Sequence, residues 1–73
     1  MTRQMLMLRN LNCPNCAAKL ERAARRLPGM ESARVAFATG ALHVQYDQAR
    51  LTEAGIRDLV RQFGLEVAAT LPA

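Results

Sequence analysis

Two cysteines, Cys13 and Cys16, are the residues of this sequence best suited to chemistry, and two residues separate them. A thiolate is a soft ligand that binds monovalent copper, zinc, cadmium, mercury or the iron of iron–sulfur clusters. Pro14 suits the first turn of a helix, where its missing N–H costs nothing. A helix N-terminus favours anionic groups. The spacing therefore predicts that both sulfurs converge on one metal ion.

The number of donors limits the kind of metal site. The sequence contains two Cys and one His, so a closed zinc site with four such ligands is excluded. Two thiolates suffice for a nearly linear monovalent copper or divalent mercury ion, whereas zinc, cadmium or lead needs oxygen donors or a partner. Asn12 and Glu66 are the candidate oxygen donors. The alternative for Glu66 is an outward-facing surface carboxylate.

Three other residues could bind a soft metal but fit simpler roles. Met5 and Met7 alternate along a predicted strand, where methionine is most often a packing residue. His43 faces away from the buried side of its predicted strand, and it is far from Cys13 in the sequence. None of the three is included in the predicted site.

Hydrophobic periodicity predicts the elements that position the cysteines. Residues 3–9 predict a strand that leads directly into the cysteine loop. A helix follows from Pro14 and ends before Pro28 and Gly29, which remove a donor and permit a positive φ. The apolar face of this helix is predicted to be Cys16, Leu20, Ala24 and Leu27.

The second half of the chain predicts a hairpin, a helix and a strand. The hairpin turns at Thr39 and Gly40. Thr52 is predicted to cap the second helix, and Gly64 to end it. A short strand is expected at residues 65–69, and residues 70–73 are expected to be a frayed end or a linker. The predicted buried positions are Ala33, Val35, Phe37, Leu42, Val44 and Tyr46 in the hairpin, and Ile56, Leu59, Val60 and Phe63 in the helix.

The element order βαββαβ predicts an α+β, ferredoxin-like sandwich, in which two helices cover one face of a four-stranded antiparallel sheet. The 73 residues fit one domain, residues 1–73, with an ordered core of about residues 3–69. A chain this short buries only roughly 60% of its unfolded surface, so an enclosed active site is not expected. The loop with Cys13 should lie at one edge of the sheet, partly exposed.

Composition argues against several classes of function. The formal net charge is +4, but the basic residues are spread along the chain, and two Phe, one Tyr and no Trp give bases little to stack on. No nucleic-acid partner is therefore predicted. No apolar run approaches the roughly 20 residues needed to cross a bilayer, so a cytoplasmic location without membrane insertion is expected. The sequence offers no acid–base pair and no phosphate-binding glycine pattern, so no enzyme is predicted.

The cysteine segment resembles the heavy-metal-associated domain family of small copper chaperones and of cytosolic modules on metal-exporting P-type ATPases. The family pattern Gly-Met-x-Cys-x-x-Cys-Ala appears as Asn10-Leu11-Asn12-Cys13-Pro14-Asn15-Cys16-Ala17. The run Leu27-Pro28-Gly29-Met30 also follows the family, and the resemblance covers residues 3–69. Leu11 and the run Cys16-Ala17-Ala18-Lys19-Leu20-Glu21 are similar to modules of zinc, cadmium and lead exporters, which often have an acidic residue at the position of Asn12.

The resemblance implies a domain that binds one zinc, cadmium or lead ion through Cys13 and Cys16. It also implies transfer of the ion by ligand exchange to the core domains of a transporter or to a partner metal-binding domain. A free-standing copper(I) chaperone or a copper ATPase domain is the first alternative. A dithiol oxidoreductase is less favoured, because a thioredoxin-like domain has more strands and because neither Trp nor Gly precedes Cys13.

Overall fold

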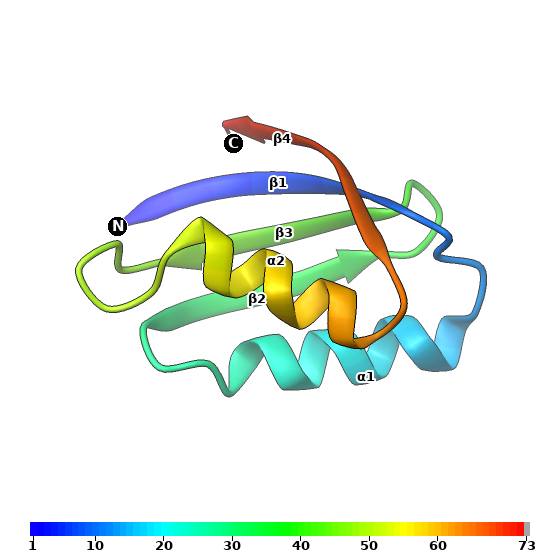
Figure 1. The fold of residues 1–73 in the computed structure, drawn as a ribbon, viewed down its shortest axis with the longest axis horizontal. Helices are drawn as coiled ribbons and strands as arrows, with labels where there is room; N and C mark the ends of the chain where they lie inside the picture. The colour runs from blue at the N-terminus through cyan, green and yellow to red at the C-terminus, as the bar shows by residue number, and fades with distance from the viewer. Residues whose placement is uncertain (73) are drawn as a thin grey trace.

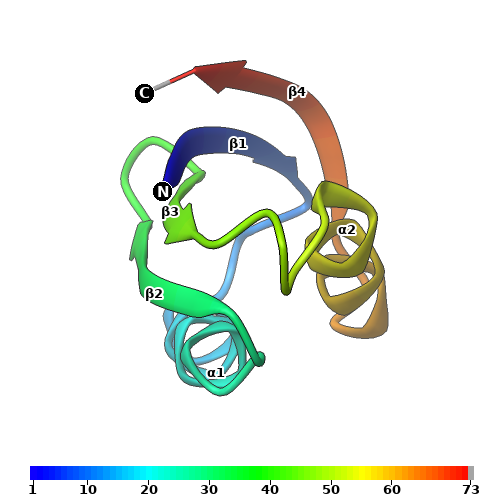
Figure 2. The same cartoon turned by 90° about the vertical axis from the view of Figure 1, so that its left-hand side faces the viewer.

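The computed structural model describes residues 1–72 as a four-stranded antiparallel sheet with two helices on one of its faces (Figures 1 and 2). The strands lie in the order β2-β3-β1-β4. The predicted α+β, ferredoxin-like sandwich is confirmed. Its elements are β1 (Thr2–Arg9), α1 (Pro14–Arg25), β2 (Met30–Ala36), β3 (Ala41–Tyr46), α2 (Glu53–Gln62) and β4 (Glu66–Pro72).

The core lies between the helices and the inner face of the sheet. Leu20 on α1, Ile56 and Val60 on α2, and Leu6 and Leu42 on the strands are fully buried. Burial of a large aliphatic side chain contributes about 1.5–3 kcal/mol, so this layer holds both helices against the sheet. The other buried hydrophobic residues are Ala17, Ala24, Ala33, Ala41, Val44, Tyr46, Leu51, Leu59 and Leu65.

The second helix begins and ends as predicted. The Thr52 hydroxyl accepts a hydrogen bond from the Gly55 N–H at 3.2 Å, which satisfies one of the free donors of the first turn. Gly64 has a φ of 75°, a left-handed conformation that glycine adopts without steric cost. The chain therefore leaves α2 sharply and enters β4.

A chain of polar contacts joins α2 to three strands at the end of β1 that is far from the cysteine loop. The Tyr46 hydroxyl donates to the Gln4 Oε1 at 2.7 Å, and the Gln4 amide donates to Glu53 at 3.2 Å. Glu53 forms an ion pair with Arg57 at 3.0 Å, and Arg57 donates to the Thr70 hydroxyl at 3.0 Å. These contacts fix this end of the domain.

The last strand is longer than predicted. β4 continues to Pro72, so residues 70–72 are neither a frayed end nor a linker. Their register partners on β1 are Leu6 for Thr70, Met5 for Leu71 and Gln4 for Pro72. The expectation for Ala73 lies outside the described residues. Because β4 is an edge strand, Pro72 is tolerated there even though it lacks an N–H.

The prediction that Phe37 is buried is wrong. β2 ends at Ala36, and Phe37 lies in the following turn with 41% of its surface exposed. The Gly40 N–H donates to the Ala36 carbonyl at 2.9 Å, and this hydrogen bond closes the turn directly after Ala36. The predicted alternation instead continues the strand through Phe37. Val35 is partly buried against the core, as expected.

Ending the chain at Ala69 should lower the free energy of unfolding by about 2 kcal/mol, because it removes three pairing positions on β1 and the Thr70 hydroxyl. Thr70→Val, which keeps the strand and removes only the hydroxyl, should lower it by about 0.5–1 kcal/mol. Urea unfolding monitored by circular dichroism measures both. An unchanged midpoint for the shortened chain would mean that these residues contribute nothing to the fold.

Candidate metal centre

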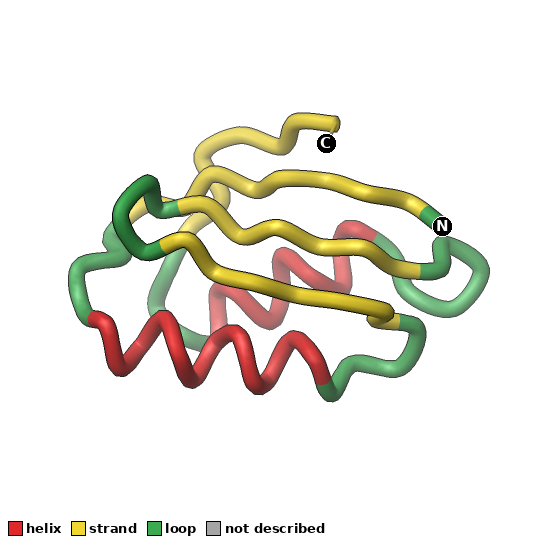
Figure 3. The backbone as a smooth tube through the Cα atoms, turned by 180° about the vertical axis from the view of Figure 1, so that it is seen from behind, coloured by secondary structure: helices red, strands yellow, loops and turns green. Residues whose placement is uncertain are grey.

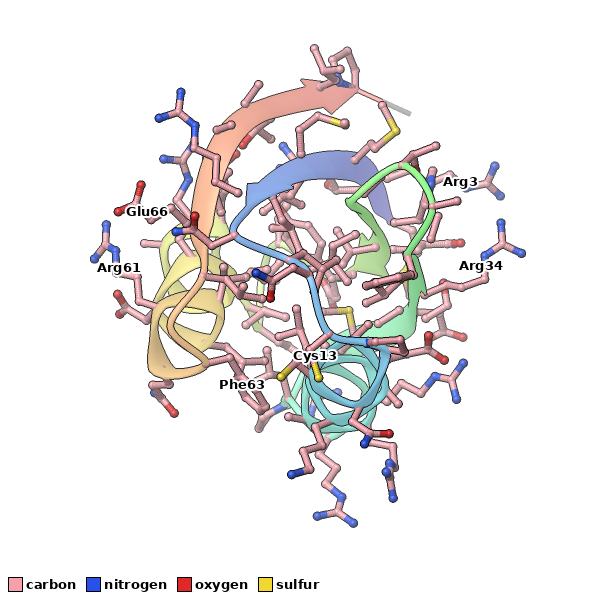
Figure 4. All side chains as sticks on the ribbon, turned by 90° about the vertical axis from the view of Figure 1, so that its right-hand side faces the viewer. Arg3, Cys13, Arg34, Arg61, Phe63 and Glu66 are labelled. Atoms are coloured by element: carbon pink, nitrogen blue, oxygen red, sulfur yellow. The ribbon has the colours of Figure 1, made fainter. Side chains whose placement is uncertain are left out.

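Cys13 and Cys16 lie at the junction between β1 and α1. Cys13 is the N-cap of α1 with extended backbone dihedrals (φ −133°, ψ 118°), and Pro14 is the first helical residue, as predicted. The Ala17 N–H donates to the Cys13 carbonyl at 3.1 Å and forms the first helical turn. Cys16 lies in this same turn. Both thiols are free and partly exposed, and Figure 4 shows Cys13 where the chain enters α1.

The two sulfurs are close enough to interact, and their pKa values move in opposite directions. The pKa of Cys13 lies below its ordinary value, first because the Cys16 N–H and then because the Cys16 thiol donate to its sulfur. The Asn15 N–H and the charge of Lys19 lower it further. The pKa of Cys16 is raised, first because its thiol hydrogen bonds to Cys13 and also because of burial and the Cys13 charge. Cys13 is therefore the first thiolate to form.

The free N–H groups at the start of α1 are what makes this corner suitable for anionic sulfur. No side chain caps the helix, and its first turn has no acidic residue. The first N–H groups of a helix have no partner within the helix. Here Cys13 stands at the N-cap, and the N–H groups of Cys16 and Asn15 favour its thiolate and so lower its pKa.

Asn10 explains how the chain turns from β1 into this loop without the glycine of the family pattern. Its φ is 68°, and among residues 1–72 it is the one non-glycine residue with a positive φ. Asn tolerates the left-handed region better than most side chains because its short amide can hydrogen bond locally. An Asn directly after a predicted strand is the sequence signal for this turn.

Apolar residues from the end of α2 lie at the same end of the molecule as the cysteines. Phe63, the C-cap of α2, is partly buried against the core and lies near Cys13 in Figure 4. Leu11 also packs against the core. Leu65, the residue after Gly64, is 5% exposed and belongs to the core itself. The loop is therefore anchored on an apolar base, and the sulfurs remain accessible.

The two candidate oxygen donors differ in their position. Asn12 is exposed and directly precedes Cys13. Glu66 is exposed on β4, where its register partner is Arg9, and it lies beside Arg61 and away from Cys13 (Figure 4). Within residues 1–72, no group of three or more Cys, His, Asp or Glu side chains comes together in a way that could hold a metal. The described residues thus bring together two sulfurs and leave ligation by Asn12 or Glu66 a prediction.

A family model for the heavy-metal-associated domain matches residues 6–66, which include both cysteines, four of the six elements in full and half of β1. This chain belongs to the heavy-metal-associated domain family. Members of this family are metal-binding modules without catalysis, so this domain is not an enzyme. No helix within residues 1–72 is both long and apolar enough to cross a membrane.

Relatives of this heavy-metal-associated domain handle different metals. The chain is 32% identical over 62 residues to a copper-exporting P-type ATPase of Bacillus subtilis, covering 85% of this chain and 8% of that protein. It is also 32% identical over 65 residues to a zinc-transporting ATPase of Synechocystis, covering 89% of this chain and 9% of that protein. The chain thus spans less than a tenth of either ATPase.

A solved structure shares the fold over its whole length. The structure of a CopZ metallochaperone superimposes with a TM-score of 0.85 at 25% identity, covering 92% of this chain and 100% of that one. The family, the fold and binding of a heavy metal are therefore established, and the relatives leave the choice between copper and zinc open.

Asn10→Val should destabilise the domain by about 1–2 kcal/mol, since a β-branched side chain is strained at a φ of 68°. Asn10→Gly should leave the stability within about 0.5 kcal/mol of the native protein, because glycine adopts this conformation freely. Urea unfolding of the metal-free, reduced proteins measures both changes. Equal stability of the Val and Gly variants would contradict the role given to Asn10.

Iodoacetamide should alkylate Cys13 before Cys16 near neutral pH, since the thiolate is the reacting form and the pKa of Cys13 is lowered. The rate at Cys13 should rise with pH and level off once the lowered pKa is passed, while the rate at Cys16 should still be rising above pH 9, because its pKa is raised from 9.0. Peptide mapping by mass spectrometry separates the two sites. Cys13→Ser should speed alkylation of Cys16, and an unchanged rate there would rule out the coupling between the sulfurs.

Proposed function

We propose that this domain binds one monovalent copper ion between Cys13 and Cys16 and exchanges it with the thiols of a partner protein. The observation that carries this proposal is the donor set: two adjacent, partly exposed thiols, with no third Cys, His, Asp or Glu beside them in residues 1–72. Two thiolates satisfy a soft ion that accepts linear coordination. They leave a zinc or cadmium ion short of ligands.

Exposure of the site supports transfer rather than storage. A two-coordinate ion at an open loop leaves room for an incoming thiolate, which can bind before either Cys13 or Cys16 leaves. The incoming thiols release their protons as they bind, and the departing sulfurs take protons up again. Each step replaces one metal–sulfur bond by another. No oxidation is involved, so the ion keeps its charge throughout.

The partner we propose is the core of a metal-exporting P-type ATPase, or a second metal-binding domain of the same family. Two observations support this proposal. One relative is a copper-exporting P-type ATPase and another a zinc-transporting ATPase, of which the chain covers 8% and 9%, and the CopZ metallochaperone is matched over its whole chain. The domain would then act at the cytoplasmic face of the membrane, either as part of the transporter or as a free carrier.

A zinc, cadmium or lead cargo is the second candidate, and it stays a prediction. The similarity to the zinc-transporting ATPase of Synechocystis favours it. The neutral Asn12 beside Cys13 and the position of Glu66 away from Cys13 favour copper instead (Figure 4). A divalent ion would need its remaining ligands from water or from the partner protein.

Titration of the reduced protein with copper(I), zinc and cadmium tests the cargo. We expect one tightly bound copper per chain, and X-ray absorption should find only sulfur neighbours around it. Cys13→Ser with Cys16→Ser should abolish this tight binding and leave the circular-dichroism spectrum intact, because neither thiol belongs to the buried core.

The Asn12→Asp variant gives the sharper comparison, because an added carboxylate should help only the divalent ions. Zinc and cadmium should bind about 10-fold more tightly, which corresponds to about 1.4 kcal/mol. Copper affinity should change by less than about twofold, since the soft ion is already satisfied. A native zinc complex with oxygen or nitrogen ligands that Glu66→Gln removes would instead establish the divalent function.

A further inference from the structure

The outer face of the sheet, which is the face opposite the helices, has no helix over it in residues 1–72 (Figure 3). Strand alternation decides which side chains point there. Leu6 on β1 and Leu42 and Val44 on β3 are buried on the helix side. Met5, Met7 and His43 alternate with them and therefore belong to the outer face.

The register brings two thioethers and an imidazole together on this face. Met5 lies directly opposite His43 in the antiparallel pairing of β1 with β3. Residues opposite one another have Cβ atoms about 4.5–5.5 Å apart, and diagonal neighbours are about 7–8 Å apart. Met7, opposite Ala41, is the diagonal neighbour of His43. Methionine has three rotatable bonds, so the sulfurs of Met5 and Met7 can both approach a metal ion held by a ring nitrogen of His43.

Core packing does not account for these methionines. Met30 packs against the buried core, as a structural methionine should, but Met5 and Met7 are not among the residues that do so. Both remain partly exposed, as does His43. Thioether and imidazole donors at a solvent boundary are available to a soft metal ion.

The positive charges around these three donors favour a monovalent ion over a divalent one. Arg34 on β2 lies opposite His43, and Arg3 is on the same face of β1 as Met5. Both guanidinium groups project from the same side of the molecule (Figure 4). Because the three donors carry no negative charge, a divalent ion would meet about twice the repulsion of a monovalent one.

We propose that Met5, Met7 and His43 form a second, weaker site for a monovalent soft ion, copper(I) or silver(I). Its affinity is lower than that of the cysteine pair, because neutral thioethers bind such ions less tightly than thiolates do. The site shares no ligand with Cys13 and Cys16 and so takes an ion when the cysteine pair is full. Binding of a second ion goes beyond the proposed function, in which the domain delivers a single ion.

Silver(I) titration of the Cys13→Ser, Cys16→Ser variant tests the site without the thiolates. With methyl-labelled methionine, the NMR signals of Met5 and Met7 should shift together with the His43 ring signals and saturate at one silver per chain. The signals of Met1 and Met30 should stay in place. In the same background, Met5→Leu with Met7→Leu should weaken binding at least about 10-fold while conserving side-chain volume.

Met30→Leu is the matched control, since it removes a thioether from the core side of the protein, and it should leave silver binding unchanged. Shifts confined to Met1, or none at Met5 and Met7, would overturn the proposal. The same signals can be followed in the intact protein during a second equivalent of silver, so a poorly folded cysteine variant would still leave a decisive result. A negative result would not bear on the proposed function of Cys13 and Cys16, because both thiols are replaced in this variant.

Discussion

The arrangement of this domain depends on burying one face of the sheet under both helices. Leu20 from α1 and Ile56 and Val60 from α2 meet Leu6 and Leu42 in one fully buried layer. To place α1 on this face, the chain must leave the end of β1, an inner strand, and begin a helix within a few residues. This requirement creates the short loop in which Cys13 lies, with an open helix N-terminus directly behind it (Figure 1).

The metal centre uses a helix end that an ordinary structural helix would have capped. A Ser, Thr, Asp or Asn cap contributes about 0.5–2 kcal/mol to a helix, and α1 does without one. Its free N–H groups instead stabilise sulfur, which lowers the pKa of Cys13. The domain therefore gives up some local stability at the site where it gains a ligand that is ready to bind. α2 keeps its Thr52 cap and carries no ligand.

Stability and accessibility are divided between the two ends of the molecule. The polar chain from Tyr46 through Gln4 and Glu53 to Arg57 and Thr70 lies at the end far from the cysteines. At the cysteine end, Leu11 and Phe63 pack against the core, and the Leu8 N–H donates to the Gly40 carbonyl at 2.8 Å. A partner can thus approach the sulfurs without disrupting the hydrogen bonds that fix α2 to the sheet.

The sequence by itself determined the features that depend on neighbouring residues. Periodicity placed the helices and the hairpin, Pro14 and Gly64 marked helix ends, and the spacing of Cys13 and Cys16 indicated a soft metal, because each of these signals acts within a few residues.

Only the tertiary structure decided features that depend on pairing between distant segments. The extension of β4 to Pro72 required β1 as its partner, and the turn at Gly40 excluded Phe37 from the sheet. The strand register likewise placed Glu66 opposite Arg9 and Met5 opposite His43. Register is set by long-range hydrogen bonds and by the fit of the whole core, so no local pattern in the sequence could reveal which of these side chains would meet.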